Sequence, residues 1–263
     1  MEYCSLASGS SGNCHYIKTE QVSLLVDVGL SAKYIKEALN QVGSSMEEIQ
    51  AVFISHDHSD HIKGLATLVK KFDFDLYIDR GIYESIKERL SIADSRLFFI
   101  DEMSFLYKDV LVEIFDISHD ATRTFGFSFS QDDKRLSVLT DVGAITQEVY
   151  DAICESDFLV IESNHDEHLV ENSRYPYHLK KRILSEWGHL SNRDCGELIA
   201  NVFLDKKRLK FALLAHLSDE NNYPELALLS VKQELSRRGI EMGKDLLVEV
   251  AHRKEITNVY RIL

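Results

Sequence analysis

The run HDHSDH at residues 56–61 places three histidines and two aspartates directly behind a short β-branched and aromatic segment that predicts a strand. Alternate residues of an extended segment share one side, so His56, His58 and Asp60 can converge. His61 swings to a neighbouring position as the chain turns into a helix. Imidazole nitrogen and carboxylate oxygen are ligands that Zn²⁺, Mn²⁺ and iron accept, and no nearby cysteine suggests a closed structural zinc site. The run therefore predicts four ligands of a metal centre.

Further candidate ligands stand alone at the ends of other predicted strands. His119 follows a strand in DISHDA, Asp141 follows one in LTDVG, and His216 ends one in LLAHLS. A two-metal site needs about seven ligands, including a bridging carboxylate, and these three residues complete the four of the run. A single loop histidine is most simply a solvated or hydrogen-bonded side chain, but the joint occurrence with HxHxDH indicates a dinuclear centre.

Short strands and helices alternate along the chain, which fits two packed sheets with helices outside or one doubly wound sheet. Strands are predicted at 22–28, 51–55, 75–78, 96–100, 110–117, 125–130, 135–140, 158–163, 211–217, 246–251 and 258–262. Helices are predicted at 31–41, 62–71, 81–90, 145–154, 179–187, 192–203 and 224–238. QDDK reads as a hairpin turn, and Ser31 and Asn192 are the expected helix N-caps.

Composition predicts one compact domain over residues 1–263. The chain is 44% hydrophobic, has no low-complexity tract, and has no apolar segment near the roughly 18 residues of a spanning helix. The amino terminus has an acid at position two and no apolar region, so we expect no signal peptide, no membrane partner and a cytoplasmic location. Four scattered cysteines without a CxxC pair are expected as free thiols.

The seven candidate ligands, together with Asp27, resemble the five motifs of the metallo-β-lactamase superfamily. These are HDHSDH, Asp27 in LLVDVG, His119, Asp141 and His216. The resemblance implies an α/β (α+β) fold, a four-layer αββα sandwich with a dinuclear site at one edge of two sheets. It implies that one metal is held by His56, His58, His119 and Asp141, and the other by Asp60, His61, Asp141 and His216. It also implies that Asp27 orients the ligand loop by hydrogen bonds, the alternative being a plain turn aspartate.

Three further stretches indicate which branch of this superfamily the chain resembles. SLASGSSGN at 5–13 is a Gly/Ser loop whose amides and hydroxyls could cradle a phosphate or form only a hairpin. ESNHD at 162–166 and EWGHLSN at 186–192 end with polar groups. Together with YPYHLKKRIL and HLSDENNYPELA, they resemble the WalJ/YycJ-like branch, which is regarded as DNA-processing with 5′→3′ exonuclease activity on double-stranded DNA. The candidate substrate contacts in these loops are Ser10, Asn13, Asn164 and His165.

The GHLS motif at 188–191 also resembles, more weakly, the Gly-His-Ser-Thr motif with which tRNase Z protonates the leaving oxygen. PhnP-type cyclic phosphodiesterases are similar at the same level. The resemblance makes His189 the candidate general acid, although the motif departs at Leu190 and the histidine could instead cap or pack beside the next helix. Asp60 is the second catalytic candidate, because a metal-ligating carboxylate can also hold the attacking hydroxide.

Charge is uneven along the chain. Residues 172–193 hold five basic residues and one acid, a net +4 in a chain of −13, so the remainder carries −17. Tyrosines and a tryptophan are interleaved, so this segment could contact phosphates and stack bases, or it could be a solvated helix face. The candidate contacts in this segment are Tyr177, Lys180, Lys181 and Arg182.

The sequence therefore predicts a metal-dependent phosphodiester hydrolase, specifically a 5′→3′ exonuclease on double-stranded DNA that uses hydroxide activated by two divalent ions. Zinc or manganese is expected before iron. A phosphodiesterase for small cyclic or nucleotide substrates is the first alternative, because the negative charge of most of the chain suits a small substrate. A non-catalytic binding or regulatory protein is the second alternative. The oligomeric state stays open.

Overall fold

The computed structural model describes residues 1–262, which form two compact units. The first unit comprises Met1–Val112, Ala121–Phe125 and the chain from His252 to its described end. The second comprises Glu113–Asp120 and Gly126–Ala251. Among the described residues, no helix combines the length and the apolar character needed to cross a membrane. The single domain over 1–263 stays a prediction.

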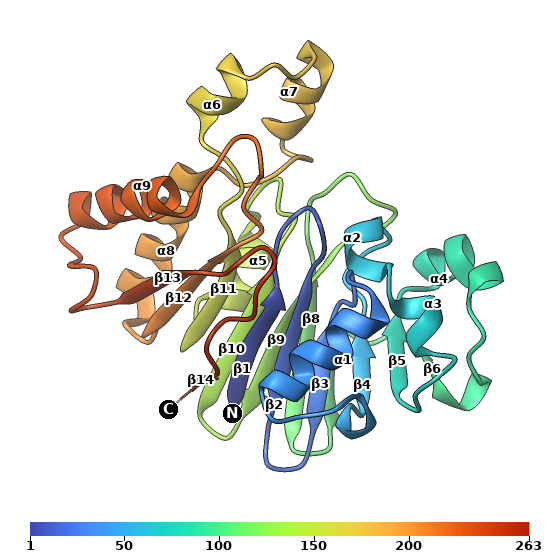
Figure 1. The fold of residues 1–263 in the computed structure, drawn as a ribbon. Helices are drawn as coiled ribbons and strands as arrows, with labels where there is room; N and C mark the ends of the chain where they lie inside the picture. Colours follow the sequence, from blue (N-terminus) through green and yellow to red (C-terminus); the bar gives the residue numbers. More distant parts are fainter. Residues whose placement is uncertain (263) are drawn as a thin grey trace. The chain divides into compact units, whose positions relative to one another are not determined.

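The first sheet has seven strands in the order β14-β1-β2-β3-β4-β5-β6 (Figure 1). Their bounds are Tyr260–Arg261, Glu2–Ala7, Cys14–Lys18, Ser23–Val26, Ala51–Phe53, Asp75–Ile78 and Leu97–Phe99. β1, β2, β3 and β14 pair antiparallel, whereas β3 to β6 pair parallel. β3 and β4 are buried along their whole length, as apolar central strands of a parallel segment should be.

The second sheet has the order β13-β12-β11-β10-β9-β8-β7. Its strands are Leu247–Val250, Phe211–Ala215, Phe158–Glu162, Lys134–Leu139, Phe125–Gln131, Val110–Asp116 and Ser104–Tyr107. β9 and β10 form the predicted hairpin, and β10 to β13 pair parallel. The register aligns Leu139 with Ile161 and Ile161 with Leu214. The carboxyl ends of β10, β11 and β12 therefore lie along one edge, where functional groups of parallel sheets gather.

Nine α-helices accompany these sheets in residues 1–262. They are α1 (Ala32–Gln41), α2 (Ser59–Ile62), α3 (Leu65–Leu68), α4 (Arg80–Ile86), α5 (Gln147–Ile153), α6 (Glu167–Asn172), α7 (Tyr177–Ile183), α8 (Asn192–Lys206) and α9 (Pro224–Arg237). Single 3₁₀ turns lie at Met46–Glu48, Lys87–Arg89 and Asp94–Arg96. α8 and α9 lie side by side in the second unit (Figure 1).

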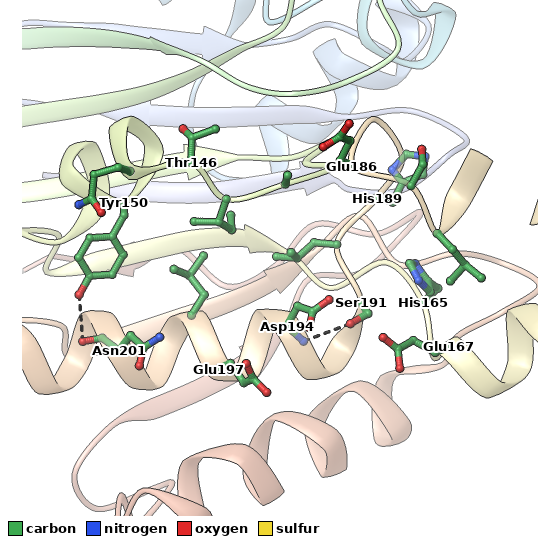
Figure 2. A pocket seen from close by; sticks show the side chains of 18 residues that line it. Thr146, Tyr150, His165, Glu167, Glu186, His189, Ser191, Asp194, Glu197 and Asn201 are labelled. Carbon is green, nitrogen blue, oxygen red and sulfur yellow. Dashed lines mark hydrogen bonds between the residues drawn. The ribbon is translucent and has the colours of Figure 1, made fainter. Parts of the chain in front are cut away.

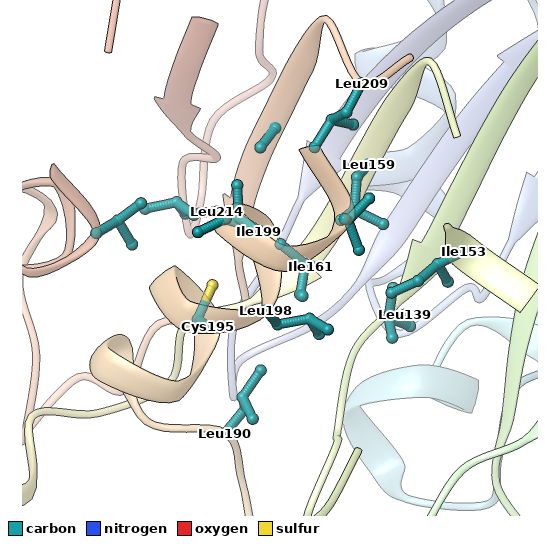
Figure 3. Packing of buried hydrophobic residues seen from close by; sticks show 14 of the residues in the cluster. Leu139, Ile153, Leu159, Ile161, Leu190, Cys195, Leu198, Ile199, Leu209 and Leu214 are labelled. Carbon is teal, nitrogen blue, oxygen red and sulfur yellow. The ribbon is translucent and has the colours of Figure 1, made fainter. Parts of the chain in front are cut away.

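Each unit has its own hydrophobic core. In the first unit, Ile35 and Leu39 of α1 pack in one cluster with Leu25 and Val52 of the central strands. In the second unit, α8 inserts apolar side chains such as Ile199 among those of β10, β11 and β12 (Figure 3). Burial of these apolar faces supplies most of the favourable free energy of folding, and it holds the strand ends that carry the polar residues.

The fold class is confirmed as α/β, with two mixed sheets and helices. Ser31 caps α1 as predicted, since its side chain accepts a hydrogen bond from the amide of Tyr34. The N-cap prediction for α8 was wrong by one residue, because Ser191 and not Asn192 accepts from the amide of Asp194. The six-residue helix α6 was not predicted.

The predicted helix over 62–71 was also wrong, since two short helices, α2 and α3, stand there instead. Gly64 separates them. Its amide donates to the carbonyl of Val28 at 2.8 Å, and a β-carbon on Gly64 would come 2.4 Å from the carbonyl oxygen of Leu30. A tertiary contact to the backbone thus interrupts the helical pattern.

Candidate functional site

The HDHSDH run of the first unit gathers its imidazoles in one place. His56 and His61 are buried, and the ring centre of His56 lies 4.7 Å from that of His58 and 4.0 Å from that of His61. His58 is extended and α2 starts immediately behind it, which turns His61 back toward His56. The half-buried carboxylate of Asp60 lies 3.7 Å from Nε2 of His61. The structure therefore brings together the four residues that the run predicts as ligands.

Asp27 holds this run from the end of β3. One carboxylate oxygen accepts from the amide of Ser55 at 2.8 Å, and the other accepts from the Ser55 hydroxyl at 2.7 Å. Nδ1 of His61 lies 2.7 Å from the same second oxygen, so the ring is fixed with Nε2 on its opposite side. A buried carboxylate that binds one ring nitrogen of a histidine sets the other nitrogen as a metal ligand.

The Gly/Ser loop is tied to the same run through Asn13. The Asn13 side-chain oxygen accepts from the amide of Gly9 at 2.9 Å, and its side-chain nitrogen lies 2.9 Å from Nε2 of His61. The Asn13 amide also donates to the carbonyl of Asp60 at 2.8 Å. Ser10 stands exposed at the tip of the loop. Asn13 thus supports the ligand run, and the phosphate contact of Ser10 and Asn13 stays a prediction.

The second unit places its candidate ligands at the carboxyl ends of separate strands. His119 follows β8, Asp141 follows β10 and His216 follows β12, and all three are buried. Oδ1 of Asp141 lies 3.6 Å from Nε2 of His119 and 3.6 Å from Nδ1 of His216. Asp141 and His216 have φ of 59° and 53°, a left-handed conformation that aspartate and histidine enter more readily than most residues. These three predicted residues are therefore also brought together.

His189 belongs to the same cluster. Its Nδ1 lies 3.6 Å from Oδ1 of Asp141, and the loop that carries it is fixed by two bonds from the end of β8. In these bonds, the ring of His119 donates from Nδ1 to the carbonyl of Gly188 at 3.0 Å, and the Ser118 hydroxyl donates to the carbonyl of Glu186 at 2.7 Å. The GHLS motif is thus held beside the candidate ligands of the second unit.

Glu162 is a further buried group of this cluster, and the sequence indicated no role for it although it begins the ESNHD stretch. It is the last residue of β11 and its side chain is fully buried. Oε1 lies 2.7 Å from Nδ1 of His216 and 3.0 Å from Nδ1 of His189, while Oε2 accepts from the amides of Val142 and Leu190 at 2.7 and 3.0 Å. The only signal in the sequence is an acid that ends the apolar strand FLVIE.

The pKa values within this cluster are shifted in opposite directions. Burial alone would raise the pKa of Glu162, but the facing His189 and His216 outweigh burial and lower it to about 2. Burial alone would lower the pKa of His189, but Glu162 and Asp141 raise it above its usual value. The physical cause is the pairing of a buried carboxylate with imidazoles, which favours the charged form of each.

The donor atoms of both clusters suit a divalent metal ion. In the second unit, Asp141, Glu162, His189 and His216 each offer a ligand atom, and these atoms all lie within 4.8 Å of one another. In the first unit, the run offers three imidazoles and the carboxylate of Asp60 as candidate donors. Nitrogen and oxygen donors of this kind bind zinc, manganese or iron, so the residues fit such ions by their chemistry.

The predicted substrate contacts at 164 and 165 lie in the second unit. The side-chain nitrogen of Asn164 donates to the carbonyl of His216 at 2.9 Å, so Asn164 supports the loop that carries His216. His165 is buried, and its carbonyl accepts from the amide of Asn192 at 2.8 Å. Its imidazole lines a pocket and contacts none of the candidate ligands by a hydrogen bond within residues 1–262.

The basic segment forms α7 and its flanks. Tyr177 is 80% exposed and Lys181 is exposed, as a surface contact requires. Lys180 donates to the carbonyl of Glu171 at 2.7 Å, and Arg182 forms an ion pair with Asp120. Part of the predicted positive charge is therefore neutralised within the second unit.

Comparison with known proteins gives concordant results. The family described as Beta-lactamase superfamily domain matches residues 23–211. The chain is 35% identical over 246 residues to the exodeoxyribonuclease YycJ of Bacillus anthracis, spanning 93% of this chain and 92% of that protein. It is 37% identical over 251 residues to the exodeoxyribonuclease WalJ of Streptococcus pneumoniae serotype 2 (strain D39), spanning 94% and 93%. The metallo-β-lactamase fold protein YhfI from Bacillus subtilis aligns with a TM-score of 0.70 and 15% identity over 97% of this chain and 98% of that one, a likeness of fold.

Proposed function

Because the chain belongs to the metallo-β-lactamase superfamily, in its WalJ/YycJ-like branch, and is a metal-dependent hydrolase, we propose that it cleaves DNA as a 5′→3′ exonuclease on double strands. The similarity to two proteins named exodeoxyribonucleases spans more than nine-tenths of the chain. The observation that carries the proposal is the pair of His189 and Glu162, which supplies a proton donor beside the candidate ligands. A cytoplasmic location is part of the same proposal.

The metal ligands we assign are those of the two clusters. They are His56, His58, Asp60, His61, His119, Asp141 and His216, with Asp27 orienting His61. The family implies divalent ions, which when bound acidify a water molecule and stabilise charge on the phosphoryl oxygens. We assign Asp60 the further role of orienting the attacking water through its second oxygen.

His189 is assigned the role of general acid. Glu162 accepts from Nδ1 of His189, which fixes the ring and leaves Nε2 as the atom that can donate. Glu162 and Asp141 raise the pKa of His189, which favours the protonated imidazole that a general acid needs. The proton passes from Nε2 to the 3′ oxygen of the nucleotide that leaves, and such a transfer is typically worth about 10²–10⁴-fold in rate.

The exposed face of the segment 172–193 is assigned to the DNA strand. Tyr177 and Trp187 are exposed aromatics that can stack on bases or sugars. Lys181 and Arg174 are exposed and form no ion pair with any residue of 1–262, so both are available for phosphates. The rest of the chain is acidic, which restricts polyanion binding to this face.

Purified protein supplied with Mn²⁺ and 5′-labelled duplex DNA tests the proposal. We expect mononucleotides to be released from the 5′ end, and Asp60→Ala to abolish the release while Asp133→Ala, on the exposed hairpin turn, leaves it intact. His189→Ala is expected to lower kcat by about 10²–10⁴-fold with metal content unchanged, and the exposed His168→Ala, outside the segment 172–193, serves as its matched control.

The same assay separates the alternatives. Single-stranded DNA, RNA and a small cyclic phosphodiester are offered alongside the duplex, because the acidic bulk of the chain also suits a small substrate. Cleavage of the small diester alone would reject the nuclease. Loss of bound metal in His189→Ala would show that His189 is a ligand and not the acid.

A further inference from the structure

A pocket of about 360 Å³ opens in the first unit beside the HDHSDH run. Asp57, which stands in the chain between the candidate ligands His56 and His58, forms part of its wall. The rest of the wall comes from α2, α3, the end of α4 and the residues that follow α4 (Figure 1). A pocket of this volume falls in the range that holds one small ligand.

The lining contains two cations that have no acidic partner. Lys63 follows α2 and Arg89 ends the 3₁₀ turn behind α4, and both residues are exposed. Neither forms an ion pair with any residue of 1–262. Lys87, two residues before Arg89, is by contrast paired with Glu84. Lys63 and Arg89 are therefore available for the oxygens of a phosphate group.

The acid of the lining, Asp57, is engaged with donors of its own. Its two carboxylate oxygens accept from the amide of Thr122 at 3.4 Å and from the Thr122 hydroxyl at 2.5 Å, and Thr122 belongs to the same unit. The lining residues, all within 57–90, thus hold two cations against one acid. The chain outside 172–193 is acidic as a whole, and this pocket is a local exception that attracts an anion.

The pocket of the second unit that Figure 2 shows has the opposite charge. None of its lining residues, all within 143–201, is a lysine or arginine. Its acidic lining consists of Glu167, Glu186, Asp194 and Glu197. Of these two pockets, the one in the first unit is therefore the one suited to a phosphate group.

Apolar side chains make up most of the remaining lining of the pocket in the first unit. They are Ile62, Leu65, Ala66, Ile86 and Leu90. Leu65 and Ile86 belong to the hydrophobic core of the unit, so the wall that they form is fixed. A phosphate ion alone would leave this wall in contact with water, whereas the base or sugar of a nucleotide would cover it. The exposed Ser59 offers a hydroxyl to the polar edge of such a base.

From these observations we propose that the pocket binds one unpaired nucleotide of the DNA, with a phosphate at Lys63 and Arg89 and the base or sugar against the apolar wall. This inference rests on the proposed function, since an exonuclease that digests one strand of a duplex leaves nucleotides of the other strand unpaired. A paired base cannot enter such a pocket, because its polar edge is covered by its partner. The inference adds a DNA contact in the first unit, next to the ligand run, to the contact assigned to segment 172–193.

Thymidine 3′,5′-bisphosphate tests the site directly, because it carries a base, a sugar and two phosphates but no phosphodiester bond to cleave. The zinc-loaded full chain is titrated with it, with thymidine and with inorganic phosphate, and ¹H–¹⁵N spectra are recorded. We expect the bisphosphate to shift the amide resonances of Ala66 and Leu90, which line the pocket. It should bind at least about tenfold more tightly than thymidine or phosphate, because only the bisphosphate reaches both the cations and the apolar wall.

Three variants separate the two parts of the site. Lys63→Ala and Arg89→Ala should each weaken binding of the bisphosphate by about three- to tenfold, the range for one charged contact at an exposed position. Lys71→Ala, an exposed cation of the same unit outside the pocket, should not weaken it. Ala66→Leu fills the apolar wall and removes no charge, so it should weaken binding by a similar factor. Thermal unfolding of each variant shows that it folds.

The salt dependence of DNA binding distinguishes the same variants. Lys63→Ala and Arg89→Ala should each reduce the slope of log K against log salt concentration by about 0.7, the single-strand value for one phosphate contact. Ala66→Leu should leave that slope unchanged, because it alters only the apolar wall. Equal slopes in all the variants and in the unchanged chain would overturn the assignment of the two cations.

Duplexes with a 3′ or a 5′ overhang show which strand supplies the unpaired nucleotide. Lys63→Ala and Arg89→Ala should raise KM by about three- to tenfold and retain kcat. A larger rise with the 3′ overhang assigns the pocket to the uncut strand, and a larger rise with the 5′ overhang assigns it to the cut strand. Unchanged KM on both substrates, or bisphosphate shifts only at residues outside the pocket, would overturn the inference.

The two proposals fail in different ways. A chain that degrades duplex DNA with unchanged KM in both charge variants refutes only the pocket. Binding of the bisphosphate at Ala66 and Leu90 by a chain that degrades no DNA refutes the nuclease and leaves the pocket as a nucleotide site.

Discussion

The two units each contain the same turn, Asp-Val-Gly, directly after or close behind a central strand, at 27–29 and 141–143. Both aspartates have a φ of 59°. Both glycines are pressed against a carbonyl of the loop that carries a candidate active group. A β-carbon on Gly29 would come 1.5 Å from the carbonyl oxygen of Asp60, and one on Gly143 would come 2.1 Å from that of Glu186.

The same turn is used differently in the two places. The carboxylate of Asp27 is engaged with Ser55 and His61, so it positions another residue. The carboxylate of Asp141 faces three imidazoles at 3.6 Å, and Glu162 positions the imidazoles of His189 and His216. One backbone geometry can thus present an aspartate as a support or as a candidate ligand, and the neighbouring side chains decide which.

Substitution of the two aspartates should reveal the largest difference between the turns, in metal affinity and activity. Asp27→Asn should lower metal affinity or activity by about 10–100-fold, the usual effect of losing a partner that orients a ligand. Asp141→Asn should lower activity by more than this, because a candidate ligand itself is changed. Metal content by atomic absorption and kcat/KM on duplex DNA measure both. Equal effects would mean that Asp141 is also only a support.

Substitution of the two glycines should give the next largest difference, in the stability of the folded chain. Adding a methyl group where no space exists typically costs about 1–3 kcal/mol, and occasionally more. Gly29→Ala, with the closer contact, should lower the unfolding midpoint more than Gly143→Ala does. Urea denaturation followed by circular dichroism gives the order. The exposed Gly43 has a φ of 76° and its β-carbon would meet nothing within 4 Å, so Gly43→Ala reports the cost of a left-handed backbone without a clash.

The smallest difference lies at two serines beside the turns. The Ser55 hydroxyl is buried and bonded to Asp27, so Ser55→Ala should cost about 1 kcal/mol of unfolding free energy. Ser118 is only half-buried and bonds the carbonyl of the exposed Glu186, so Ser118→Ala should cost less. A larger loss for Ser118→Ala would show that the loop of residues 186–189 is the more constrained of the two.

The sequence could predict which polar residues lie together within each unit, because each stands where an apolar strand stops. HDHSDH is contiguous, and His119, Asp141 and His216 are polar residues that end otherwise apolar runs. Such positions meet at one edge whenever parallel strands are in register, so the strand pattern alone brings these residues together within each unit.

Glu162 could not be recognised in the same way. An acid at the end of a strand is usually solvated, and nothing in FLVIE shows that β10 and β12 will cover it. Its partners His189 and His216 are 27 and 54 residues away. The break of the 62–71 helix at Gly64 was hidden for the same reason, since its cause is a contact with the distant backbone at Val28.

The edge strand β14 of the first sheet is synthesised long after its partner β1. β1 pairs with β14 through Tyr3 and Tyr260, and the hydroxyl of Thr257 accepts from the amide of Ser5 across 252 residues. At about 5–20 residues per second, the ribosome needs roughly 13–50 s to make the intervening chain. During that time the backbone N–H and C=O groups along one edge of β1 have no strand partner and can pair with another chain. Residues 56–61 are therefore made well before β14, the strand that covers this edge of the sheet.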